Sequence, residues 1–130
     1  MSTQKKILIV EDDNDLRNIL SEHLGRYYEI AQAEDGEKGY SFILDFKPDL
    51  VLLDLMLPKL PGLELLERLR KNPDTTLAKT KVVIFSNFSK PEYMTKAQEL
   101  GASDYLIKSD TDLNELIKKI EKIISEPSPS

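Results

Sequence analysis

The stretch Leu50-Val51-Leu52-Leu53-Asp54 constrains the fold of this chain more than any other. Four consecutive apolar residues are typical of a strand buried on both faces, because a strand with one wet face would alternate apolar and polar residues. The run ends in a carboxylate, and Pro58 and the Pro61-Gly62 pair are turn signals. In open parallel sheets, ligands bind at the carboxyl ends of the strands. We therefore expect Asp54 to lie at the mouth of a functional site.

Strand-like and helix-like segments alternate along the whole chain. The other expected strands are Ile7–Val10, Tyr28–Ala33, Val82–Phe85 and Tyr105–Ile107. The expected helices run from Asn14 to Leu24, from the turn Asp35-Gly36 to Phe46, from Leu63 to Lys71, from Ser89 to Leu100 and from Asp112 to about Ile124. Five strand–helix repeats predict an α/β fold with an open five-stranded parallel sheet in the order 2-1-3-4-5, since a barrel needs about 250 residues. We expect one domain over residues 1–125 and a disordered tail over residues 126–130.

Several local signals refine the expected helices. Asn14 is a candidate N-cap for the first helix, and Ser89-x-x-Glu92 and Asp112-x-x-Glu115 resemble capping boxes. The apolar periodicity predicts that Ile19 in the first helix and Leu44 in the second face the core, and it is clearest between Leu113 and Ile124.

Composition excludes several classes of protein. The 130 residues include no cysteine, so disulfides and thiolate metal sites are excluded and a reducing, cytoplasmic compartment is expected. No apolar segment approaches the roughly 20 residues of a membrane span. The net charge of −5 argues against direct binding of nucleic acid as the main function.

The expected strand order brings five polar side chains to one edge of the sheet. Strands one and three are neighbours, which places Glu11 and Asp12 beside Asp54, while Ser86 and Lys108 end strands four and five. Three adjacent carboxylates repel one another unless a cation neutralises them, and oxygen ligands favour a hard ion such as Mg²⁺. Asp54 is the best placed nucleophile for forming an aspartyl phosphate, with Lys108 and Ser86 available to bind phosphoryl oxygens.

These residues resemble the receiver domains of two-component response regulators, whose fold is flavodoxin-like and CheY-like. The resemblance covers residues 5 to 125. Its four blocks are the strand ending in Glu11-Asp12-Asp13, the strand ending in Asp54 with its loop to Pro58, the pair Phe85-Ser86, and the segment Gly101-Ala-Ser-Asp-Tyr-Leu-Ile-Lys108. Any one block alone is weak, and the four together at these spacings are specific.

The resemblance implies a mechanism and a set of partners. A histidine kinase or a histidine phosphotransfer protein would donate a phosphoryl group to Asp54. Asp12, Asp54 and the Met56 carbonyl would ligate Mg²⁺ directly, with Glu11 acting through water. Ser86 and Tyr105 would then switch the surface of the fourth helix, fifth strand and fifth helix for an unknown downstream protein. The protein would be a monomer or a phosphorylation-dependent homodimer, with no enzymatic activity beyond self-phosphorylation and slow autodephosphorylation.

Three positions depart from the family pattern. Ser109 follows the lysine where the family usually has proline, so a trans bond is expected there. Asn87 stands where a small residue is common, and Pro61 where the family often has aspartate. None of these departures removes a reacting group.

Other interpretations remain open for the whole chain and for single residues. A Mg²⁺-dependent phosphatase or phosphotransferase using an Asp nucleophile would often need a second acid two residues on, where this chain has Met56. A flavodoxin-like cofactor protein would need a phosphate-binding loop after the first strand, and a degenerate receiver would lack part of the residue set. Asp13 is interpreted as a helix cap and His23 as an exposed helix residue, while Tyr105 is either a switch or an edge residue with its hydroxyl in water.

Overall fold

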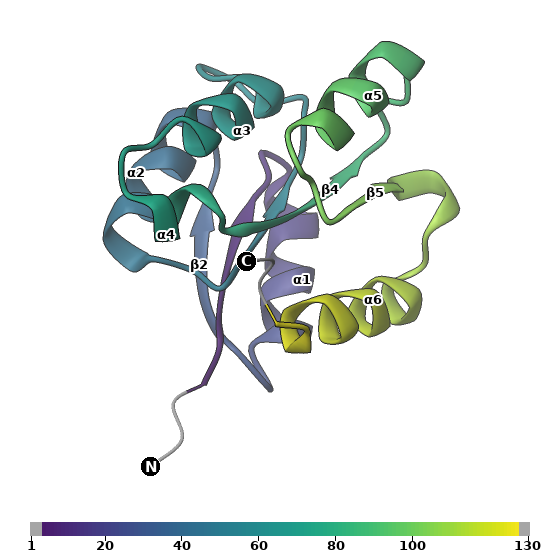
Figure 1. Ribbon diagram of the computed structural model, residues 1–130. Helices are drawn as coiled ribbons and strands as arrows, with labels where there is room; N and C mark the ends of the chain where they lie inside the picture. Colours follow the sequence, from purple (N-terminus) through teal and green to yellow (C-terminus); the bar gives the residue numbers. More distant parts are fainter. Residues whose placement is uncertain (1–3, 128–130) are drawn as a thin grey trace.

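The computed structural model describes residues 4–127, which form an α/β fold around one parallel sheet (Figure 1). The strands are β1 (Lys6–Val10), β2 (Glu29–Ala33), β3 (Leu50–Leu53), β4 (Lys81–Ser86) and β5 (Asp104–Ile107). Their order across the sheet is β2-β1-β3-β4-β5, and every neighbouring pair is parallel. The predicted order is therefore confirmed. Residues 128–130 of the predicted tail lie outside the described part of the chain.

Helices cover both faces of this sheet (Figure 1). They are α1 (Asn14–Leu24), α2 (Gly36–Phe46), α3 (Gly62–Arg70), α4 (Thr75–Ala78), α5 (Pro91–Glu99) and α6 (Leu113–Ser125), with a 3-10 turn η1 (Lys108–Asp110) after β5. Within residues 4–127, no helix combines the length and the apolar character that crossing a membrane requires.

The core has two halves because successive side chains of a strand point to opposite faces of the sheet. On one face, Leu8, Val10 and other strand residues pack with α2 to α5. On the other face, Ile7, Ile9 and their neighbours pack with α1 and α6. All four residues of β3 are buried, as expected for the central strand.

Two predicted helix caps are wrong. The N-cap of α1 is Asp13 rather than Asn14, since the Asp13 carboxylate accepts hydrogen bonds from the N–H groups of Asp15 and Leu16. The interpretation of Asp13 as a helix cap is therefore confirmed. Helix α5 begins at Pro91 with Lys90 as an N-cap that makes no side-chain bond, so the capping box at Ser89 does not form. Proline favours the first helical position, which moves the start of α5 past Ser89.

The structure corrects two core assignments and adds two short elements. Ile19 and Leu44 are 47% and 40% exposed, because they lie beside the buried stripes of α1 and α2 rather than within them. Helix α4 and the turn η1 are four and three residues long, too short to give a periodic pattern in the sequence.

Arg70, the last residue of α3, joins three segments of the chain. Its guanidinium donates to the carbonyl oxygens of Ala78 and Thr80, at 2.9 and 2.7 Å, and of Leu100 and Gly101, at 2.6 and 3.2 Å. Burial lowers the pKa of Arg70. Because Ala78 and Leu100 lie at the C-terminal ends of α4 and α5, the cation also faces the negative ends of two helix dipoles.

The loop that follows β3 is fixed by close backbone packing. A side chain at Gly36 would place its Cβ 1.8 Å from the Leu60 carbonyl oxygen, so only glycine fits at the start of α2. The Gly36 N–H donates to the Pro58 carbonyl at 3.2 Å, and the Gly62 N–H donates to the Leu55 carbonyl at 3.0 Å. These contacts hold the loop at the carboxyl end of the sheet.

The buried cap of α2 gives a pH-dependent prediction for stability. The Lys38 N–H bond to the Asp35 carboxylate outweighs burial and lowers the pKa of Asp35. We expect Asp35→Ala to lower the free energy of unfolding at pH 7 by about 1–2 kcal/mol, the usual cost of a lost cap. This contribution exists above the unfolded pKa, near 3.9, and disappears as the pH falls through the lower folded value.

Denaturant unfolding at pH 7 and at about pH 3 measures this effect. Asp112→Ala is the matched control, because Asp112 caps α6 through the same kind of bond, to the Glu115 N–H, but is exposed. Its cost should be smaller. Equal free energies of unfolding for Asp35→Ala and the parent protein at pH 7 would contradict the prediction.

Candidate functional site

The strand register brings the predicted carboxylates together. Val10 pairs with Leu53, so Glu11 and Asp54 leave β1 and β3 side by side. Backbone bonds continue the pairing, from the Asp54 N–H to the Val10 carbonyl at 3.1 Å and from the Glu11 N–H to the Ala33 carbonyl at 3.0 Å. The side chains of Glu11 and Asp54 are buried, whereas Asp12 is exposed.

Lys108 forms ion pairs with two of these carboxylates. Its Nζ lies 2.6 Å from Glu11 Oε1 and 2.7 Å from Asp54 Oδ2. Burial lowers the pKa of Lys108, but the hydrogen bonds to Asp54 and Glu11 outweigh it and leave the pKa raised. The pKa of Glu11 is raised, chiefly because burial disfavours its charged form, despite the bond to Lys108. The predicted meeting of Glu11, Asp54 and Lys108 is therefore present.

The remaining oxygens of the acidic group suit a hard cation. Carboxylate oxygens of Glu11, Asp12 and Asp54 lie within 4.8 Å of one another. Asp54 Oδ1 accepts a hydrogen bond from the Met56 N–H at 3.1 Å, which holds the Met56 backbone next to Asp54. An all-oxygen set with one solvent-exposed member fits Mg²⁺, which keeps several of its waters when bound. Direct ligation by the Met56 carbonyl stays a prediction.

Ser86 and Tyr105 are connected through the backbone of Phe88. Ser86 is fully buried, and its Oγ accepts a bond from the Phe88 N–H at 3.2 Å. The Tyr105 hydroxyl donates to the Phe88 carbonyl, so the interpretation that leaves this hydroxyl in water is wrong. Burial, and then the charge of Asp54, raise the pKa of Tyr105. Phe88 itself packs edge-on against Tyr93, with ring centroids 4.5 Å apart.

Two departures from the family pattern meet in the structure. The Asn87 Oδ1 accepts a hydrogen bond from the Ser109 N–H at 2.9 Å. Residues 4–127 contain no cis peptide bond, which confirms the expected trans bond before Ser109. The sequence identified both residues separately, but a side chain bonding to a distant backbone N–H leaves no pattern in a sequence.

His23, which was interpreted as an exposed helix residue, is half-buried on α1.

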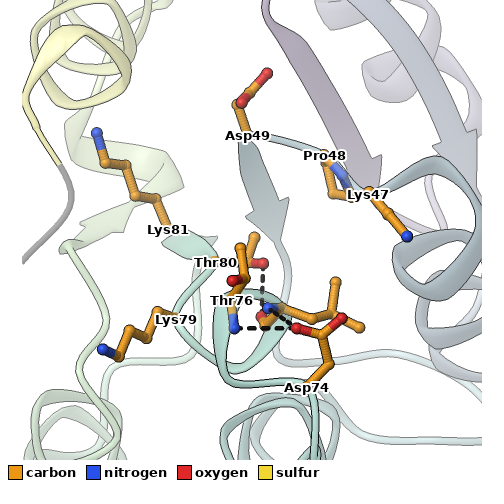
Figure 2. A pocket seen from close by; sticks show the side chains of 9 residues that line it. Lys47, Pro48, Asp49, Asp74, Thr76, Lys79, Thr80 and Lys81 are labelled. Carbon is orange, nitrogen blue, oxygen red and sulfur yellow. Dashed lines mark hydrogen bonds between the residues drawn. The ribbon is translucent and has the colours of Figure 1, made fainter.

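A groove at the end of the sheet opposite Asp54 is lined by polar groups that stabilise the local structure (Figure 2). It measures about 590 Å³ and lies beside the amino ends of β3 and β4, lined by Lys47, Pro48, Asp49, Asp74, Thr76, Leu77, Lys79, Thr80 and Lys81. Asp74 caps α4 and Thr80 bonds to the Leu77 carbonyl. The Lys81 ammonium donates to the carbonyls of Ile123 and Glu126 near the end of α6. These polar groups stabilise local structure and are remote from Asp54.

Comparison with known proteins agrees with this site. Residues 7–121 match the family described as the response regulator receiver domain. The chain is 36% identical over 131 residues to the alkaline phosphatase synthesis transcriptional regulatory protein PhoP of Bacillus subtilis, covering 97% of this chain and 52% of that protein. A receiver domain protein (CheY-like) from Methanospirillum hungatei has a similar structure, with a TM-score of 0.85, 27% identity and 94% of both chains covered.

The curated relatives are longer proteins. The DNA-binding dual master transcriptional regulator RpaA of Synechocystis is 32% identical over 120 residues, which cover 92% of this chain and 48% of that protein. The chain thus spans about half the length of the curated relatives it matches. Because one of these relatives is a DNA-binding regulator, the expectation that nucleic acid is not a direct partner has no support.

The position of Lys108 predicts how the acidic group binds cations. Removing the ammonium should strengthen Mg²⁺ binding, because its positive charge repels the ion and occupies an Asp54 oxygen. We expect Lys108→Met to lower the Kd for Mg²⁺ about tenfold, equivalent to roughly 1.4 kcal/mol. Isothermal titration calorimetry at pH 8 measures the effect. Lys59→Met, which removes an ammonium 3.7 Å from Asp35, is the control. An unchanged or weaker affinity in Lys108→Met would contradict the prediction.

Proposed function

Because the chain belongs to the response regulator receiver domain family, we propose that its phosphoacceptor is Asp54. Receiver domains act as signalling proteins. The chemistry required here is the transfer of one phosphoryl group to the protein and its slow loss. The observation that carries the assignment is the contact of one ammonium, Lys108, with both the Asp54 and Glu11 carboxylates. This is the arrangement that a phosphoryl-accepting carboxylate needs, since it combines a nucleophile with a group that binds the incoming charge.

The proposed transfer requires little covalent chemistry from the protein. An Asp54 carboxylate oxygen attacks the phosphorus atom of a phosphohistidine. The new O–P bond replaces the P–N bond, and the electron pair of the broken bond stays on the imidazole nitrogen, which takes up a proton. With acetyl phosphate as the donor, the leaving group is acetate. Positioning and charge neutralisation supply most of the catalysis in reactions of this class.

Each neighbour of Asp54 has a separate task in this proposal. The Lys108 ammonium moves its hydrogen bond from Asp54 Oδ2 to a phosphoryl oxygen. The Ser86 oxygen accepts the Phe88 N–H, so its own hydrogen can be donated to a second phosphoryl oxygen. Mg²⁺ held by Asp12, Asp54 and the Met56 carbonyl, with Glu11 acting through water, would neutralise charge on the carboxylates and the phosphoryl group. The cluster of carboxylate oxygens supports the three acidic members of this set.

The proposed partners follow from the family. A histidine kinase or a histidine phosphotransfer protein is the donor, and a downstream protein binds the phosphorylated form. The chain itself is a monomer or a phosphorylation-dependent homodimer. We propose that the exchange takes place in the cytoplasm, and the absence of cysteine is compatible with a reducing compartment.

The proposed output surface is formed by α5, β5 and α6. Movement of the Ser86 hydroxyl toward a phosphoryl group would loosen its bond to the Phe88 N–H, and the Phe88 carbonyl carries the bond to Tyr105. Helix α5 follows directly and has one fully buried residue, Ala97, together with an N-cap that makes no side-chain bond. Few buried contacts make an element easy to shift.

A phosphatase acting on a small substrate is the weaker alternative. Met56, two residues after Asp54, cannot act as a general acid or base. The Met56 side chain is 58% exposed beside the acidic group. The groove of Figure 2 lies at the opposite end of the sheet and brings no reacting group to Asp54.

Phosphorylation can be measured directly. With Mg²⁺ and acetyl phosphate, the intact mass of the protein should increase by one phosphoryl group, and the increase should be absent without Mg²⁺ and in Asp54→Asn. Asp45→Asn, which alters an exposed carboxylate on α2, is the matched control and should be phosphorylated normally. An unchanged mass of the parent protein, with acetyl phosphate and also with a phosphorylated histidine donor, would contradict the proposal.

Met56 and Phe88 stand two positions after Asp54 and Ser86, and their apolar side chains predict a slow loss of the phosphoryl group. Hydrolysis requires a water aligned with the phosphorus atom, and neither Met56 nor Phe88 can form a hydrogen bond that orients it. A positioned general base contributes about 10²-fold or more, so we expect Met56→Asn with Phe88→Glu to speed dephosphorylation several-fold to about 10²-fold. The decay of the phosphorylated mass in excess Mg²⁺ measures the rate.

Two further variants serve as controls for this measurement. Met94→Asn, on the exposed side of α5, is the control for the methionine and should leave the decay unchanged. Phe88 also packs against Tyr93, so Phe88→Leu tests whether the loss of that packing alone alters the rate. Equal decay in the parent protein and the double variant would show that neither side chain controls access of water.

A further inference from the structure

A single hydrogen bond joins the two loops that follow Ser86 and Lys108. Asn87 comes directly after Ser86, and Ser109 comes directly after Lys108. The Asn87 Oδ1 accepts from the Ser109 N–H at 2.9 Å. Ser86 pairs with Ile107 in the register of β4 and β5, so this bond lies just beyond the last paired residues of the sheet.

The bond holds a segment that has little other support. The turn η1 starts at Lys108 and has no side-chain cap. The residues on either side of the bond, Asn87 and Ser109, are both exposed, so burial does not fix them. The backbone of Lys108 is thus held on one side by β5 and on the other by this side-chain contact. The Lys108 ammonium, by contrast, has to reach two specific carboxylate oxygens.

We propose that Asn87 is a positioning residue for phosphoryl transfer, acting through Lys108. Its amide oxygen fixes the Ser109 N–H and thereby the start of η1, which sets the distance from the Lys108 backbone to Asp54. The bond also ties the residue after Ser86 to the same point, so the two groups assigned to the phosphoryl oxygens keep a constant separation. Positioning errors of this kind lower the rate of a transfer without removing any reacting group.

This inference rests on the proposed role of Asp54, but part of its test needs no phosphoryl group. In the unphosphorylated protein, Asn87→Ala should move the amide proton signal of Ser109 upfield and shift the side-chain Cε signal of Lys108. Asn87→Asp keeps an acceptor oxygen and should retain the Ser109 signal. Asn114→Ala, which changes an exposed asparagine on α6, should alter neither signal. An unmoved Ser109 or Lys108 signal in Asn87→Ala would overturn the proposal, whether or not Asp54 is phosphorylated.

Kinetics with acetyl phosphate test the consequence for transfer. The maximal phosphorylation rate of Asn87→Ala should fall by about three- to tenfold, with little change in the donor concentration for half-saturation. Asn87→Asp should restore most of the maximal rate while raising the half-saturating concentration, because its added charge repels an anionic donor. A purely structural loop contact would leave the maximal rate unchanged. If the parent protein is phosphorylated and Asn87→Ala has the same maximal rate, the positioning role is overturned and the role of Asp54 remains intact.

Discussion

The contact of Lys108 with Glu11 and Asp54 is the interaction on which the rest of this structure depends. The acidic group carries three negative charges, and one ammonium leaves two of them uncompensated. Two of the carboxylates are buried, where an unpaired charge is far more costly than in water. A divalent cation of the proposed kind would bring the group to neutrality. The fold therefore keeps a charge imbalance at one edge of the sheet that matches the ion it is proposed to bind.

Rigidity is distributed unevenly around this edge. The loop after β3 is fixed by the Gly36 and Gly62 contacts, and the C-terminal end of α5 is held by the Arg70 guanidinium. The N-terminal end of α5 lacks a side-chain cap, and its Tyr93 contacts the Phe88 ring edge-on. A displacement of α5 is consequently easier at its N-terminal end than at its C-terminal end. The N-terminal end is the one that follows Ser86 in the chain.

Sequence patterns predicted this fold well where they reflect burial and strand ends. The apolar runs ending in Glu11, Asp54, Ser86 and Lys108, combined with the strand order common in open parallel sheets, were sufficient to place Lys108 at the same edge as the carboxylates. Helix caps were less predictable, because Asp13 and Asn14 are chemically similar as caps and Pro91 competes with Ser89. The four carbonyls bound by Arg70, and the bond from Ser109 to Asn87, were not predictable. They involve backbone groups brought together only by the completed fold, and a backbone group is the same at every position of a sequence.

The link from Ser86 to Tyr105 has a consequence for how such a chain can evolve. Both of its hydrogen bonds end on the N–H and the carbonyl of residue 88, and the phenylalanine side chain takes part in neither. A substitution at this position can change the side chain proposed to limit the access of water to Asp54, while the N–H and the carbonyl remain. Relatives with different side chains at this position can therefore diverge in how long their signal persists and still transmit it along the same route.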